Sequence, residues 1–168
     1  MKLSDGVEAA IHCATMLAAL KDDAVLPTTA LAEFYGVSAS YLAKHLSALV
    51  RCDILISVNG PAGGFRLQRP ADKITLLDVV LAIEGDAPAF RCAEIRRNGP
   101  GAPDASAYIK PCGIKSAMLA AERAWRGELA KTSIADLVQS FRAEADTRSL
   151  ARNRAFVADT ARVQPRTD

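Results

Sequence analysis

Apolar residues recur at helical spacing in three stretches near the N-terminus. Residues 4–20 carry them every three or four positions, which predicts an amphipathic helix. A shorter pattern covers residues 28–35 and ends at Gly36, and a third covers residues 38–51 behind a serine that can cap it. Two short helices joined across a glycine turn are typical of a helix-turn-helix.

A hairpin is predicted directly behind these helices. Residues 54–58 form a β-branched run, residues 59–64 read Asn-Gly-Pro-Ala-Gly-Gly, and residues 65–67 return as Phe-Arg-Leu. A hairpin in this place is typical of the wing of a winged helix-turn-helix. Its glycines would let the hairpin backbone approach the sugar-phosphate backbone of DNA. Thr75 and Asp78 then form a capping box that opens an apolar helix ending at Gly85.

The second half of the chain divides into a loop, two helices and a tail. Proline and glycine recur through residues 86–112 without a sustained period, so we expect a long loop with a sensory role. Residues 113–145 hold two helical patterns, the second boxed by Ser133 and Asp136. Residues 146–168 are polar and arginine-rich, and we expect a flexible tail.

The first of these two helices has an apolar stripe that one chain has too few elements to cover. The stripe consists of Met118, Ala121, Trp125 and Leu129, with Ile114 at its start. We expect a second subunit to cover it, which predicts a homodimer. The predicted fold is mainly α with a small β-hairpin: a winged helix-turn-helix over residues 1–85, followed by a long dimerisation helix.

Composition excludes several classes of protein. The chain has 168 residues, 50% of them hydrophobic, and no apolar run near the roughly 20 residues that span a bilayer. Its start resembles no secretion signal, so we expect a cytoplasmic protein. It has two histidines and no motif of a nucleophilic triad, phosphate loop or metalloprotease, which argues against an enzyme.

A net charge of +2 does not by itself indicate DNA binding, so the distribution of polar groups must do so. On the third helix the polar positions fall on the side opposite the leucines, which favours recognition of a major groove. We predict these DNA-binding residues: Thr28, Ser38, Ser40, Tyr41, Lys44, His45, Arg51, Asn59, Gly60, Gly63, Gly64 and Arg66.

Three motifs in order carry a resemblance to a known family. They are Ser-Ala-Ser-Tyr-Leu-Ala-Lys at 38–44, Gly-Pro-Ala-Gly-Gly-Phe at 60–65 and Ile-Thr-Leu-Leu-Asp-Val at 74–79. Together they resemble the IscR/NsrR-type winged-helix regulators over residues 1–140. This resemblance implies a homodimer that binds a palindromic operator on double-stranded DNA, usually as a repressor, with many members sensing iron, nitric oxide or redox state through an iron-sulfur cluster.

The cysteines depart from the pattern of that family. Its cluster-binding members hold three cysteines before the dimerisation helix, whereas this chain has only Cys92 and Cys112 there. The family packs the first helix of one subunit near the loop of the other. With this resemblance, Glu8 and His12, four residues apart on one helical face, are candidates to complete the ligand set of a two-iron two-sulfur cluster, and the simpler interpretation is a solvent-exposed pair.

Three other interpretations stay open at this point. Cys92 and Cys112 form a reversible disulfide, or one is an oxidisable thiolate favoured by nearby basic residues. Otherwise the protein has no cofactor and responds to a small ligand, or it is an interaction module that has lost DNA binding. Cys13 and Cys52 are expected to be buried and inert.

Overall fold

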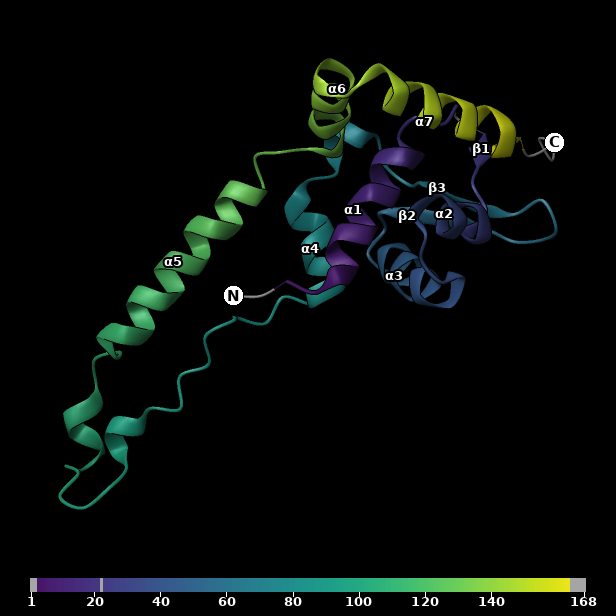
Figure 1. The fold of residues 1–168 in the computed structure, drawn as a ribbon. Helices are drawn as coiled ribbons and strands as arrows, with labels where there is room; N and C mark the ends of the chain where they lie inside the picture. The colour runs from purple at the N-terminus through teal and green to yellow at the C-terminus, as the bar shows by residue number, and fades with distance from the viewer. Residues whose placement is uncertain (1–2, 22, 164–168) are drawn as a thin grey trace.

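The computed structural model describes residues 3–21 and 23–163, most of them in helices (Figure 1). The α-helices are α1 (Asp5–Leu17), α2 (Thr28–Tyr35), α3 (Ala39–Arg51), α4 (Leu76–Glu84), α5 (Gly113–Leu129), α6 (Ile134–Glu144) and α7 (Thr147–Thr160). The strands are β1 (Ala24–Val25), β2 (Leu55–Val58), β3 (Gly64–Leu67) and β4 (Arg162–Val163). Short 3-10 turns are η1 (Ala71–Lys73), η2 (Ile95–Arg97) and η3 (Ala105–Tyr108).

Local capping explains where several helices start and stop. The Ser38 side chain accepts a hydrogen bond from the backbone N–H of Tyr41, and α2 ends at Gly36 in the left-handed conformation. Complete capping boxes open α4, between Thr75 and Asp78, and α6, between Ser133 and Asp136. The predicted starts of these helices are confirmed.

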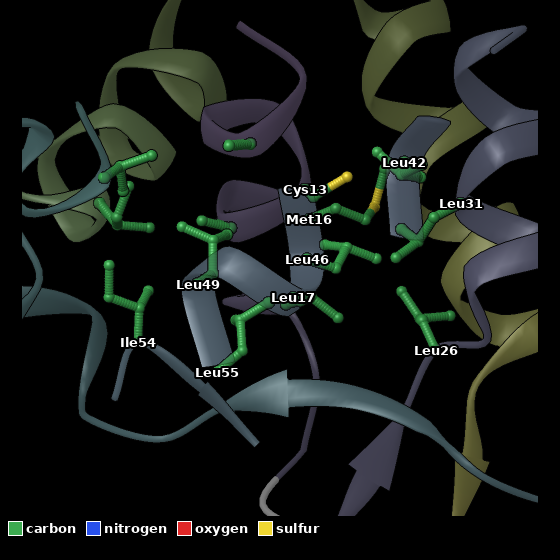
Figure 2. Packing of buried hydrophobic residues seen from close by; sticks show 14 of the residues in the cluster. Cys13, Met16, Leu17, Leu26, Leu31, Leu42, Leu46, Leu49, Ile54 and Leu55 are labelled. Atoms are coloured by element: carbon green, nitrogen blue, oxygen red, sulfur yellow. The ribbon is translucent and has the colours of Figure 1, made fainter. Parts of the chain in front are cut away.

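The hydrophobic core lies where α1, α2 and α3 meet the base of the hairpin. Figure 2 shows the leucines of α3 beside Leu17 of α1, with Ile54 and Leu55 beyond them. Leu42, Leu46 and Leu49 are fully buried, as their spacing along α3 predicts. This packing holds α3 against the core through its leucine side, and the opposite side of the helix is exposed.

The hairpin joins a second short strand pair through β1. Strand β2 pairs with β3 in antiparallel register, with Val58 opposite Gly64. Leu26, directly after β1, exchanges backbone hydrogen bonds of 3.0 and 2.9 Å with Phe65 of β3. The wing is thereby anchored to the segment that enters α2.

Helix α5 extends away from the rest of the molecule, and the irregular segment 86–112 lies along it and at its outer end (Figure 1). No residue of α5 is buried. Helix α6 returns to the core, where Ile134 is fully buried and its N–H donates to the Ile74 carbonyl at 2.8 Å. The grouping of residues 113–145 as dimerisation helices is therefore wrong for α6, which belongs to the winged domain.

The C-terminal residues correct a second prediction. A flexible tail was predicted from residue 146, but residues 147–160 form α7, and β4 pairs with β1 in antiparallel register. Most of α7 is exposed, which explains why its sequence is polar although the segment is helical. Phe156 and Val157 pack against the core and attach the helix to it. Residues 164–168 lie outside the described residues. Among the described helices, none has the length and apolar character to cross a membrane.

Candidate nucleic-acid interface and cysteine loop

The outer side of α3 is a polar and basic surface. Three residues predicted to bind DNA are exposed here: Ser40, Lys44 and Arg51. The neighbouring Ser47 is exposed as well, and the four positions lie three or four residues apart. Lys44 and Arg51 make no ion pair within residues 3–21 and 23–163, so their charges are available to a ligand. Exposed Ser38 precedes them at the start of the helix. This surface has the shape and charge that suit a major groove.

The wing lies beside the start of α2, with a groove between them. Half-buried Thr28 and exposed Thr29 line this groove together with the wing turn. Asn59 and Gly60 at the turn are exposed, whereas Arg66 on β3 is half-buried. The predicted wing residues therefore share one surface with the entry to the helix-turn-helix.

Two of the predicted wing glycines are also required by the fold itself. A Cβ at Gly64 would collide with the carbonyl oxygen of Leu26, and a Cβ at Gly63 would collide with the carbonyl oxygen of Val58. Glycine is required at both positions because the chain packs against its own backbone. Close approach to DNA is not needed to explain them.

His45 was predicted to reach bases, and the structure contradicts its exposure. Its side chain is 8% exposed and packs edge-on to Tyr41, with ring centroids 4.6 Å apart. Burial, and then the charge of Lys44, lowers the pKa of His45, and its Nε2 has no hydrogen-bond partner among the described residues. Position 45 follows Leu42 by three residues, so it turns toward α1. His45 is therefore a packing residue between α3 and α1, while half-buried Tyr41 lies at the edge of the exposed face.

Replacing Gly6 by alanine is expected to lower the stability of the fold. A Cβ at Gly6 would collide with the His45 ring, so α1 and α3 would have to separate or the buried ring would have to move. We expect a loss of about 1–3 kcal/mol in the free energy of unfolding, although alanine is normally favoured over glycine inside a helix. Urea titration measures the loss. In a His45→Ala background the same substitution should no longer destabilise, and an unchanged penalty there would contradict the contact.

The two predicted ligands on α1 are accessible. Glu8 and His12 are both exposed and lie one turn apart. The Tyr35 hydroxyl of α2 donates to the His12 carbonyl at 2.9 Å, and the two rings are 5.5 Å apart. Cys13, by contrast, is fully buried as predicted, and burial raises the pKa of its thiol to about 12. Cys52 was expected to be buried as well, but it is exposed at the end of α3.

The loop that carries Cys92 and Cys112 has internal order. The Tyr108 hydroxyl donates to the Arg96 carbonyl at 2.6 Å, and the Arg96 guanidinium lies 5.3 Å from the Tyr108 ring centre. Cys112 precedes α5, where the backbone N–H groups of Lys115 and Ile114, and then the Arg96 charge, lower the pKa of its thiol. Cys92 is half-buried. The lowered pKa of Cys112 is in line with its place at the start of a helix, where thiolates are favoured.

Within one chain the four candidate ligands do not meet. The loop lies beside and beyond α5, whereas Glu8 and His12 lie on α1 in the globular part (Figure 1). Across residues 3–21 and 23–163, no three His, Cys, Asp or Glu side chains are grouped to hold a metal ion. A site with all four ligands therefore requires two chains.

The predicted dimerisation stripe is open along α5. Ile114 is 67% exposed and Met118 44%, and Ala121 is exposed as well. Trp125 and Leu129, nearer the globular part, are half-buried. The single chain leaves the outer half of the stripe in solvent.

Sequence reasoning missed the contacts that the C-terminal residues make. Arg152 of α7 donates to the Phe34 carbonyl at 2.7 Å, and Arg162 of β4 donates to the Pro61 carbonyl at 2.6 Å. The available signal was Asp146 as a cap followed by Leu150, Phe156 and Val157 at helical spacing. Tyr35 was also missed, because no local pattern distinguishes it from a core aromatic.

Comparisons with known proteins agree with this geometry. Residues 3–140 match the family model described as Rrf2, iron-dependent transcriptional regulator. A protein of Lactococcus lactis named HTH-type transcriptional regulator YffB is 35% identical over 137 residues, which is 82% of this chain and 86% of that protein. Another of Bacillus subtilis, named HTH-type transcriptional regulator YwgB, is 39% identical over 91 residues, 54% of this chain and 58% of that one.

Solved structures share the fold. The cysteine regulator CymR of B. subtilis superposes with a TM-score of 0.64 at 19% identity, covering 83% of this chain and 97% of its own. IscR of T. potens gives 0.64 at 18% identity, covering 90% and 96%. These matches confirm the predicted winged-helix fold and the predicted resemblance, and the relatives named as regulators agree with the expectation that the chain is not an enzyme.

Proposed function

Because this chain belongs to the Rrf2 family of transcriptional regulators, we propose that it acts in the cytoplasm as a homodimeric repressor whose affinity for its operator depends on redox state. The observation that carries the proposal is the exposed polar and basic side of α3, the helix that the β2–β3 wing directly follows along the chain. Redox control is assigned to Cys92 and Cys112.

The dimer is proposed from the open stripe on α5. Pairing of two α5 helices through Ile114, Met118 and Ala121 would remove this apolar surface from water. A two-fold dimer presents two copies of α3, which would enter successive major grooves of a palindromic operator. Each wing would then lie against the backbone beside its α3.

The donor set fits an iron-sulfur cluster shared between subunits. Cys92 and Cys112 of one subunit supply two thiolates, and Glu8 of the partner subunit and His12 of the partner subunit supply a carboxylate and an imidazole. The two α1 side chains are exposed, Cys112 is buried at the start of α5, and the lowered pKa of its thiol favours the thiolate that would bind iron. The iron dependence in the family's description supports this choice. A bound cluster would supply reversible one-electron chemistry.

Helix α1, which carries two of the proposed ligands, contacts both helices of the helix-turn-helix. The His12 carbonyl holds the Tyr35 hydroxyl of α2, and Gly6 packs against His45 of α3. A shift of α1 would therefore move both helices of the helix-turn-helix. Such a shift would change the spacing of the two recognition surfaces and with it the operator affinity.

Thiol oxidation is the second chemistry for the same two residues. Cys92 and Cys112 would form a disulfide by losing two electrons and two protons to a hydroperoxide, which is reduced to an alcohol and one water. The lowered pKa of Cys112 favours it as the attacking thiolate.

Anaerobic purification, with a visible absorption spectrum and iron and sulfide analysis, tests the cluster. We expect a coloured protein with about two irons and two sulfides per site, as a two-iron cluster requires. A colourless protein that cannot be reconstituted would rule the cluster out, and mass spectrometry of peroxide-treated protein would then test the disulfide.

DNA binding is tested separately by titration against the promoter region of the protein's own gene. A specific complex that weakens steeply as salt rises supports the regulator. Absence of a complex in the apo, reduced and oxidised forms would contradict it and favour an interaction module.

A further inference from the structure

The C-terminal segment, residues 146–163, lies outside the part of the chain that matches the family model, which ends at residue 140. It nevertheless folds back onto the DNA-binding domain (Figure 1). Three successive contacts connect it to the helix-turn-helix and the wing.

Helix α7 is attached to α2 through one aromatic residue. The Phe156 ring lies 4.5 Å from the Phe34 ring, centre to centre. The Arg152 guanidinium lies 4.0 Å from the centre of the same Phe34 ring and also donates to the Phe34 carbonyl. Stacking and a charged hydrogen bond on one residue give α7 a defined place on the helix-turn-helix.

Strand β4 continues this attachment toward the wing. Arg162 pairs with Val25 and Val163 with Ala24 in β1. The next residue after β1, Leu26, is hydrogen-bonded to Phe65 at the base of the wing. Strand β4 and the base of the wing therefore contact consecutive residues, because β4 pairs with Ala24 and Val25 and the wing is hydrogen-bonded to Leu26.

The last contact reaches the tip of the wing. Arg162 Nη1 donates to the Pro61 carbonyl at 2.6 Å, across 101 residues of sequence. The turn at residues 59–63 contains two glycines and is mostly exposed, and within it the Gly63 N–H donates to the Gly60 carbonyl at 2.9 Å. Arg162 also lines the groove between this turn and Thr28 of α2.

We propose that Arg162 is a positioning residue for DNA binding, which holds the wing tip in its binding position before the operator arrives. A flexible tip would have to be ordered on binding, and that entropic cost lowers affinity. The C-terminal segment then restrains the wing of the same chain. This proposal rests on the proposed DNA-binding function.

Replacing Arg162 by alanine tests the proposal. We expect the operator to be bound roughly fivefold to tenfold more weakly, the scale of one typical net hydrogen bond, as measured by fluorescence anisotropy. Arg154→Ala is the matched control, because Arg154 is exposed on α7, has no hydrogen bond or ion pair within the described residues, and carries the same charge. Equal losses of affinity in both variants would show that binding depends on the total positive charge and not on the contact of Arg162 with the wing, and would overturn the proposal.

A shortened wing separates positioning from other roles. Deleting residues 61–63 leaves Asn-Gly between Val58 and Gly64, which are paired, and this dipeptide favours a two-residue hairpin turn. In this background Arg162→Ala should have no further effect. A persisting loss would assign Arg162 to direct DNA contact or to general stability and overturn the proposal.

Hydrogen exchange gives a readout that needs neither DNA nor the shortened wing. In Arg162→Ala we expect faster exchange at residues 60–64 and unchanged exchange in α1. Unchanged exchange at the turn would overturn the proposal even if affinity falls. If the wild-type protein binds no DNA, the proposed function fails, while the exchange result still reports whether Arg162 restrains the wing.

Discussion

Replacing Cys112 by serine is expected to abolish the redox response of operator binding. We expect wild-type affinity to differ between the reduced and oxidised protein by about tenfold or more, in line with a coupling energy of about 1–3 kcal/mol, and the variant to differ by less than about twofold. Serine neither ionises near neutral pH nor forms a disulfide, so both proposed chemistries are lost. Serine is also a preferred N-cap, so α5 should still start at the same place. Anisotropy titrations under both conditions measure the response.

The chain offers a matched control for this variant. Cys52 is also a free thiol, is exposed, and lies at the end of the recognition helix α3. Cys52→Ser should leave the response intact. A response that survives in Cys112→Ser, or is lost in Cys52→Ser, would contradict the assignment of the sensor to the loop before α5.

Replacing Lys44 and Arg51 together by alanine is expected to weaken operator binding by about tenfold to a hundredfold at moderate salt, because each side chain can neutralise a phosphate or bind a base edge. Both side chains are exposed, and neither is engaged in an ion pair elsewhere among the residues described. If both contact phosphates, the slope of log affinity against log salt should fall by about two. Titrations at several salt concentrations measure both quantities.

Lys73→Ala with Arg142→Ala removes the same charge from η1 and α6, outside the proposed surface. That pair should change affinity by less than about threefold, as expected for distant charges screened by salt. If the two double variants lose affinity equally, the binding surface lies elsewhere.

The parts of the fold that local chemistry controls could be predicted from the sequence. Capping side chains and the left-handed Gly36 act within a few residues, so the starts of α3, α4 and α6 and the end of α2 were predicted correctly. The leucine spacing of α3 also identified its buried side. The open stripe on α5 followed from the same argument, because one chain lacks partners for it.

Contacts between distant segments were beyond the same reasoning. His45 has the sequence context of an exposed residue, and only the missing side chain at Gly6, 39 positions earlier, makes room for its ring. Helix α7 was missed because its sequence is rich in arginine, and its contact with α2 depends on Phe156 and Arg152 meeting the distant Phe34. In both cases the deciding partner is remote in sequence, and no local period encodes it.

The separation of the cysteine loop from α1 within one chain has a genetic consequence. Under the proposed shared site, each of the two sites in a dimer takes cysteines from one chain and Glu8 with His12 from the other. A mixed dimer of one Cys112→Ser chain and one Glu8→Ala chain would concentrate both defects in a single site and leave the other intact. Two inactive proteins would then complement each other when co-expressed, whereas sites built within each chain would both be defective.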